Sequence, residues 1–134
     1  MSAERRRRSA PSFAVRRVYE SGAGDGGYRV LVDRLWPRGI KKQELALDEW
    51  LKDAAPSTEL RRWYGHDPAR FEEFARRYRD ELSRPPGSEV VERLLDLAGR
   101  RPVVLLTATR DVERSGAQVL HDVLVERGGR SPWP

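Results

Sequence analysis

The fold is decided by the stretch Pro102-Val-Val-Leu-Leu-Thr107, a short and continuous apolar run. A run of this length without polar interruption is typical of a β-strand that is buried on both faces. We therefore expect residues 102–107 to form the central strand of a sheet. A last helix should follow the polar hinge at 109–111. The apolar positions on one face of that helix are Ala117, Leu120 and Leu124.

Two further strands are expected near the N-terminus. The stretches 13–18 and 28–35 are rich in β-branched and aromatic residues, and a glycine-dense turn at 21–27 separates them. The connection is too short for a helical crossover, so the two strands should be antiparallel if they pair directly. The turn lacks the spacing of a phosphate-binding P-loop, and we interpret it as a flexible loop.

Two helices are expected between residues 57 and 82, after an irregular or short helical stretch at 41–51. Ser57 can cap the first helix, and Gly65 can end it in the left-handed conformation. Asp67 and Pro68 can open the second helix, because Asp caps helices and Pro suits the first helical position. The second helix has one apolar face, formed by Phe71, Phe74, Ala75, Tyr78 and Leu82.

A third helix should lie between the breaker at 85–87 and the central strand, with Ser88 as its cap and Gly99 at its end. The expected order is therefore β-β-α-α-α-β-α. This order indicates a small α/β domain whose sheet of about three strands is flanked by helices. The long helical crossover before the central strand should be right-handed if the strands that it joins are parallel.

Length and composition limit the class of protein. A chain of 134 residues that is 38% hydrophobic and 35% charged can bury the core of one domain. No apolar run approaches the roughly 18 residues that a membrane span requires, and no apolar segment follows the basic N-terminus. The absence of cysteine excludes disulfides and thiolate metal sites. We therefore expect a cytoplasmic protein with no membrane association.

The charge is unevenly distributed along the chain. We expect a flexible basic tail at 1–12, a single α/β domain at 13–128 and a C-terminal tail at 129–134. The formal net charge is +5, and most of it comes from Arg5 to Arg8 in the basic tail. Such a tail could bind the phosphates of a nucleic acid, although a solvated tail is the interpretation that we favour. The domain itself is nearly balanced in charge.

The strongest candidate site is the motif Val32-Asp-Arg-Leu-Trp-Pro-Arg-Gly39, where a strand ends in charged residues and a turn. Ligands of open α/β sheets lie beyond the carboxyl ends of parallel strands. We therefore expect Arg34, Trp36 and Arg38 to bind a ligand, and Asp33 is a candidate for proton transfer. In the alternative interpretation, Asp33 forms a salt bridge with an arginine and Trp36 covers the core.

A second group of polar residues should reach the same edge if the strands are parallel. Thr109, Arg110 and Asp111 follow the central strand, and the N-terminus of the last helix would add backbone N–H groups that favour an anion. His66 lies in a loop and is a second candidate for acid–base chemistry, unless it only closes the preceding helix. The two histidines lack the spacing of a zinc site. We therefore expect no metal, and the sequence identifies no cofactor.

Several segments appear in an order that carries a family resemblance, from about residue 15 to residue 124. They include Val32-Asp-Arg-Leu-Trp-Pro-Arg-Gly39, Asp48-Glu-Trp50, residues 55–61, Trp63-Tyr-Gly-His-Asp-Pro68 and residues 74–82. With these motifs the chain resembles the YeaO-like branch of the domain-of-unknown-function family 488. The resemblance implies an α/β fold with a pocket near residues 33–39. It implies no reaction, cofactor or catalytic residue.

The chain departs from the family pattern near its end. Similar proteins usually have an aromatic residue, two alanines and Lys-Asp where this chain has Thr107-Ala-Thr-Arg-Asp111. A His-Asn pair that is common a few residues later is replaced here by Ser115-Gly116. If that pair serves chemistry in relatives, this chain has lost or changed it.

The leading hypothesis is a cytoplasmic α/β domain that binds a small anionic or phosphorylated ligand. Arg34, Arg38 and Arg110 would hold the anion, and whether the ligand is turned over stays open. One alternative is a nucleic-acid-binding accessory protein that uses the basic tail, which the balanced charge of the domain disfavours. Another is a protein-interaction module, which the polar groups at the strand ends disfavour. The oligomeric state stays open.

Overall fold

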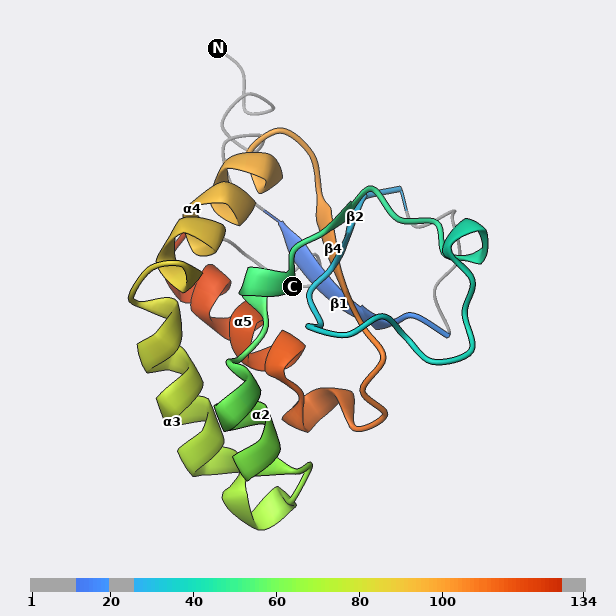
Figure 1. Cartoon of the computed structure of the whole chain (residues 1–134). Coiled ribbons are helices and arrows are strands. Elements are labelled where there is room, and N and C mark those ends of the chain that lie inside the picture. The colour runs from blue at the N-terminus through green and yellow to red at the C-terminus, as the bar shows by residue number, and fades with distance from the viewer. Residues whose placement is uncertain (1–11, 20–25, 129–134) are drawn as a thin grey trace.

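The sheet is built around the strand that the sequence places at its centre. The computed structural model describes residues 12–19 and 26–128, and over these residues the strands are β1 (Phe13–Arg17), β2 (Tyr28–Leu31), β3 (Glu49–Trp50) and β4 (Val103–Thr107). Their order in the sheet is β1-β4-β2-β3, and every neighbouring pair is parallel (Figure 1). All residues of β4 are buried. The α/β class and the central position of this strand are therefore confirmed.

The expected relation between the first two strands is corrected by the structure. β1 and β2 are not neighbours, so the antiparallel pairing expected of direct neighbours does not arise. β4 lies between them, and Phe13 and Tyr28 both lie opposite Val103. The apolar β4 offers hydrogen-bonding groups along both edges. Pairing with both N-terminal strands satisfies these groups and places the apolar β4 in the interior of the sheet, where all its residues are buried.

The stretch expected to be irregular contains a further strand. β3 pairs with β2 over two residues, with Val30 opposite Glu49 and Leu31 opposite Trp50. A strand of this length is too short to show an alternating pattern in the sequence. β2 also ends earlier than expected, at Leu31 rather than at residue 35. The backbone of Val32 still donates to Leu106 of β4, and residues 33–35 then carry the chain into the candidate site.

The helices begin and end largely where the capping residues predict. They are α2 (Thr58–Tyr64), α3 (Phe71–Leu82), α4 (Gly87–Ala98) and α5 (Gly116–Glu126), with short 3-10 helices η2 (Lys42–Glu44), η3 (Lys52–Ala54), η4 (Pro68–Arg70) and η5 (Val112–Arg114). The Ser57 side chain accepts a hydrogen bond from the backbone of Leu60 at 3.2 Å, and Gly65 ends α2 with φ of 53°. Asp67 caps η4, which leads into α3.

The start of α4 differs from the expectation. Ser88 does not cap this helix, because α4 begins at Gly87 and Pro86 occupies the capping position without a side-chain hydrogen bond. The chain turns sharply there, and a Cβ atom at Gly87 would lie 2.7 Å from the carbonyl oxygen of Glu81. The close approach of α3 and α4 therefore sets the helix start, and the helix ends at Gly99 as expected.

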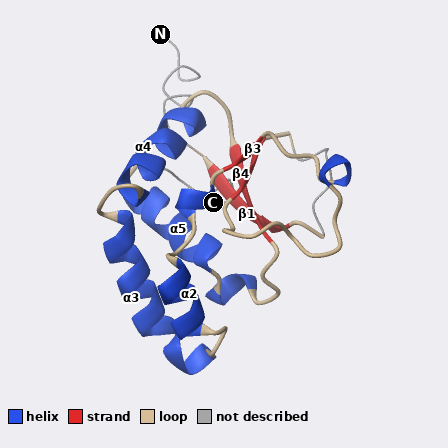
Figure 2. Cartoon of the chain, in the orientation of Figure 1, coloured by secondary structure: helices blue, strands red, loops and turns tan. Residues whose placement is uncertain are grey.

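The two faces of the sheet are covered differently. The helices lie on one face, where the buried face of α3, formed by Phe74, Tyr78 and Leu82, belongs to the larger apolar cluster (Figure 2). Phe71 and Ala75, also expected on that face, are partly buried against it. The other face is covered by the segment at 36–50, whose residues pack on Leu31, Val104 and Leu106. The α-helices of the described residues thus flank the sheet on one side only, and the other side carries the short η2.

Some expectations lie outside the described residues. They concern the basic tail up to residue 11, most of the glycine-dense turn and the tail at 129–134. Within the part of the chain that is described, no helix combines the length and the apolar character that a membrane span requires.

Candidate functional site

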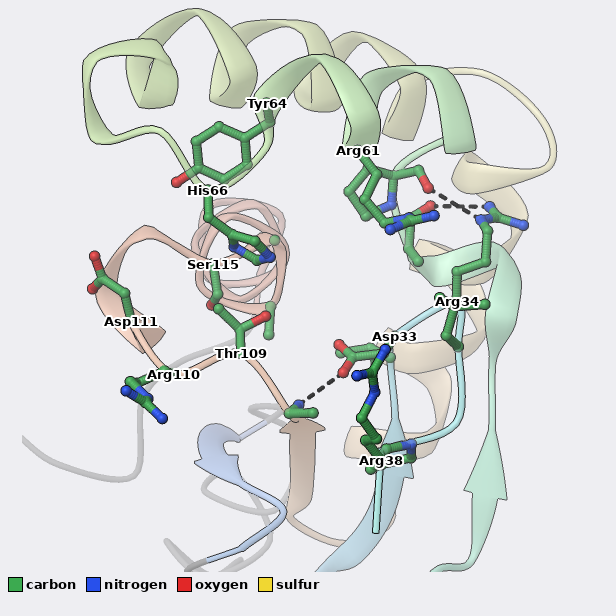
Figure 3. Close-up of a pocket in the computed structure, with 18 of the residues that line it drawn as sticks. Asp33, Arg34, Arg38, Arg61, Tyr64, His66, Thr109, Arg110, Asp111 and Ser115 are labelled. Atoms are coloured by element: carbon green, nitrogen blue, oxygen red, sulfur yellow. Dashed lines mark hydrogen bonds between the residues drawn. The ribbon is translucent and has the colours of Figure 1, made fainter. Parts of the chain in front are cut away.

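A pocket of about 550 Å³ opens where β2 and β4 end (Figure 3). The two strands are parallel, so the segments that follow them meet at one edge of the sheet. The structure brings all the predicted site residues to the lining of this pocket. They are Asp33, Arg34, Trp36, Arg38, His66, Thr109, Arg110 and Asp111.

Asp33 is held by the strand next to it. One carboxylate oxygen accepts a hydrogen bond from the hydroxyl of Thr107 at 2.8 Å, and the other accepts one from the backbone N–H of Ala108 at 2.8 Å. Burial raises the pKa of Asp33, while these two hydrogen bonds and nearby His66 oppose that rise. Among the described residues, no arginine forms an ion pair with Asp33, so the alternative of a salt bridge is not realised.

Trp36 fixes the turn that follows Asp33. Its indole N–H donates to the carbonyl of Ile40 at 2.6 Å, and its ring packs edge-to-face on Trp50 with the centroids 5.4 Å apart. The indole of Trp50 in turn donates to the backbone carbonyl of Asp33 at 2.7 Å. Trp36 therefore packs against the core, as the alternative interpretation expected, while it also lines the pocket.

Arg34 shapes the wall of the pocket. Its guanidinium donates to the backbone carbonyls of Pro56 at 3.2 Å and Ala55 at 3.4 Å. These bonds join the end of β2 to the segment that leads into α2, as the dashed lines of Figure 3 show. Part of the donor capacity of Arg34 is thus already used by the protein itself.

Three other arginines at the pocket are differently placed. Arg38 follows the turn, Arg61 lies on α2 and Arg110 lies on the hinge, and all three are exposed. Within the described part of the chain, none of their side chains has a hydrogen bond or an ion pair. Sequence reasoning missed Arg61. The available signal was its position three residues before Tyr64, which places both on neighbouring parts of one helix face.

The other residues of the hinge contact their own neighbours. Asp111 pairs with Arg114 at 2.9 Å, and both side chains are half exposed. The backbone N–H of Thr109 donates to the hydroxyl of Thr107 at 3.2 Å. Thr107 therefore joins the hinge to the carboxylate of Asp33, which fixes the edge of the pocket at the end of β4.

His66 has an unusual backbone conformation. Its φ is 58°, in the left-handed region that residues other than glycine rarely adopt. His66 directly follows Gly65, which is also left-handed. In Figure 3 its ring points toward the hinge and Ser115. The ring centroid lies 6.0 Å from that of Tyr64, whose hydroxyl donates to the backbone carbonyl of Arg114 at 2.6 Å. The α2–α3 turn thus presents an imidazole to the pocket.

The two positions that depart from the family pattern have structural roles here. The buried hydroxyl of Ser115 donates to the carbonyl of Val112 at 2.6 Å and accepts the N–H of Gln118 at 3.1 Å, which caps α5. At Gly116, an added Cβ atom would lie 3.3 Å from the ring of Pro56. The start of α5 therefore packs tightly on the segment before α2, and the hydroxyl of Ser115 is fully engaged.

The described residues contain no group of three or more His, Asp or Glu side chains placed to hold a metal ion. Among the Asp and Arg side chains that line the pocket, four arginines outnumber two aspartates, and guanidinium groups repel cations and attract anions. The arrangement therefore suits an anionic ligand.

Comparisons with known proteins agree on one family. The model of a family described as the inactive DUF488-N3 subclade matches residues 12–131. An uncharacterized protein of Mycobacterium tuberculosis is 52% identical over 110 residues, which cover 82% of this chain and 91% of that protein. The uncharacterized protein YeaO of Escherichia coli is 43% identical over 113 residues, which cover 84% of this chain and 96% of YeaO. No solved structure matches the chain. The resemblance seen in the motifs is confirmed, and the chain belongs to the DUF488 family as a YeaO-like member.

Proposed function

We propose that the pocket binds a small anionic ligand between Arg38, Arg61 and Arg110. The observation that carries this proposal is that three arginines, from three separate segments, line one pocket and have no acidic partners among the described residues. Guanidinium groups bind phosphate and carboxylate through paired, charge-assisted hydrogen bonds. Arg34 supports the site by fixing its wall.

The two acidic groups of the pocket are both already engaged by the protein itself. Asp111 is paired with Arg114, which offsets its charge. The carboxylate of Asp33 is held by Thr107 and Ala108, and burial raises its pKa. The N-terminus of α5 also faces the pocket, and its helix dipole adds positive potential there.

The proposal is binding without turnover. The matching family is described as inactive. The chain contains no cysteine that could act as a nucleophile, and the hydroxyl of Ser115 is used in capping α5. In this proposal Asp33 and His66 orient the ligand rather than transfer protons.

Two neighbouring arginines on α2 provide a matched test. Arg61 and Arg62 are both exposed, and neither side chain has a partner among the described residues, but Arg61 lines the pocket and Arg62 does not. Inorganic phosphate should bind the wild type in a calorimetric titration and raise its melting temperature. Arg61→Gln should weaken phosphate binding at least tenfold, because one of three guanidinium groups is lost. Arg62→Gln should leave the affinity unchanged.

The same titration with sulfate tests whether a second tetrahedral oxyanion binds at the same arginines. Sulfate should bind with similar arginine dependence. Equal weakening by Arg61→Gln and Arg62→Gln would show that only the overall positive charge attracts the anion. No phosphate or sulfate binding to the wild type would overturn the proposal.

A further inference from the structure

We infer that the ligand is an organic anion, in which an apolar body is attached to the anionic group, and that Leu35 contacts this body. The inference rests on the proposed function, since it names the class of ligand for the same pocket. It starts from the apolar side chains at the pocket, whereas the proposed function starts from the arginines.

The first observation is the exposure of Leu35. Its side chain is 61% exposed, and Tyr19 is 47% exposed, and these are the two exposed large hydrophobic residues in the described part of the chain. Both line the candidate pocket. A single exposed leucine needs no explanation, but two exposed apolar side chains at the same pocket form a surface that a ligand can cover.

The second observation is that the surface is held in place. The hydroxyl of Tyr19 donates to the backbone carbonyl of Arg38 at 3.0 Å, and the guanidinium of Arg17 lies 5.0 Å from the centre of its ring. Leu35 lies between Arg34 and Trp36, which are both fixed by their hydrogen bonds to backbone carbonyls. The apolar side of the pocket is therefore largely formed before a ligand arrives, which lowers the entropy cost of binding.

The third observation is the size and character of the interior. A cavity of about 550 Å³ lies in the range that holds a small organic molecule, and an inorganic phosphate would leave much of it filled with water. Its apolar lining also includes Ala55, Pro56, Phe74, Ala108 and Ala117. An apolar body would displace water from these walls, while the anionic group stays with the exposed arginines.

The test compares ligands that share one anionic group. Inorganic phosphate, phenyl phosphate and hexyl phosphate are titrated into the full chain by calorimetry, with phenol as an uncharged probe. Phenyl or hexyl phosphate should bind at least tenfold tighter than inorganic phosphate, because burial of the six-carbon body adds to the binding of the anion. The two organic phosphates show whether the body is aromatic or aliphatic. Phenol should bind far more weakly than phenyl phosphate.

Variants of Leu35 test whether the preference for organic over inorganic phosphate depends on the apolar surface of the pocket. Leu35→Ser should reduce the preference for the organic phosphates at least threefold and leave the affinity for inorganic phosphate unchanged. Leu35→Met keeps the apolar contact and should keep the preference. Because residue 35 is exposed, both variants should melt at the temperature of the wild type.

The other outcomes separate the two proposals. Equal affinity for inorganic and organic phosphates would overturn this inference and leave the proposed function standing. Failure of every phosphate to bind would remove both. If Leu35→Ser instead dissociates an oligomer in sedimentation experiments without changing the preference, the apolar surface is a contact between copies of the chain, and the inference is wrong.

Discussion

The arginines on the outer helices and those at the pocket differ in what they contact. Arg76 and Arg77 on α3 share Glu73, with nitrogen-to-oxygen distances of 2.5 and 2.7 Å, and their hydrogen bonds lower the pKa of Glu73 to about 2. Arg79 pairs with Glu126, and Arg93 pairs with Glu49, each at 2.8 Å. The arginines at 38, 61 and 110 have no such partner in the described part of the chain.

This difference shows that a high arginine content does not by itself indicate an anion site. Most of the arginines on the outer helices pair with a glutamate on the same helix, on another helix or on β3. Arg62 shows that a missing partner is not sufficient either, because it lies away from the pocket. The positions that combine an unpaired guanidinium with a cavity are the ones that favour a ligand.

The comparison separates residues that stabilise the fold from residues that serve a ligand. The largest effect on the free energy of unfolding is expected for a substitution on the buried face of α3. Phe74 is fully buried and stacks on Tyr64 with the ring centroids 4.1 Å apart. Phe74→Ala should lower the free energy of unfolding by about 3 kcal/mol, because it leaves a cavity in the core. Arg76→Ala, on the outer face of the same helix, should change the urea midpoint very little. Similar effects of both variants would contradict the assignment of the two faces.

Asp33 gives the next largest effect. Asp33→Ala leaves the hydroxyl of Thr107 and the N–H of Ala108 without their acceptor, which should cost about 2 kcal/mol. The pKa of Asp33 is raised in the folded protein, so its protonated form is favoured there, and its contribution to stability falls as the pH rises through the raised pKa. The cost of Asp33→Ala should therefore be greatest below about pH 4 and smaller at neutral pH.

Urea unfolding of both proteins from about pH 3 to about pH 8, which extends from below to above the ordinary pKa of an aspartate, measures this difference directly. A cost of the substitution that grows with pH would mean that the hydrogen bonds to the carboxylate outweigh its burial.

His66 tests whether the pocket stores backbone strain. His66→Gly should raise the free energy of unfolding by about 1 kcal/mol, because glycine adopts the left-handed conformation without a steric penalty. His66→Ala keeps the strain and serves as the control, with no gain in stability. The same His66→Gly variant should bind phosphate more weakly. A loss of stability in His66→Gly would show that contacts of the imidazole outweigh the strain.

The smallest expected effect on stability is at the pocket arginines themselves. Arg38→Gln and Arg110→Gln should change the free energy of unfolding by about 0.5 kcal/mol or less, because neither guanidinium completes an ion pair among the described residues. Both variants should nevertheless lose most of the stabilisation by phosphate seen in a thermal-shift assay. Strong destabilisation without any phosphate effect in the wild type would identify these arginines as structural.

Much of the fold could be predicted because the signals are local. The apolar run at 102–107 indicates a buried strand, and the capping positions of Ser57 and Asp67 depend on contacts within a few residues. The apolar face of α3 follows from a spacing that any helix imposes. The residues expected at the site also converge, because the ends of parallel strands meet at one edge of a sheet.

The sequence by itself therefore determined the α/β class, the central strand, most helix ends, the family and the segment that holds the candidate site. Only the tertiary structure decided the strand order, the two-residue β3, the partners of Asp33 and Arg34, and the presence of Arg61 at the pocket. Those features depend on contacts between residues far apart in the chain, such as Asp33 with Thr107. Local periodicity and capping preferences carry no information about which distant groups will meet, because that choice is made by packing of the whole domain.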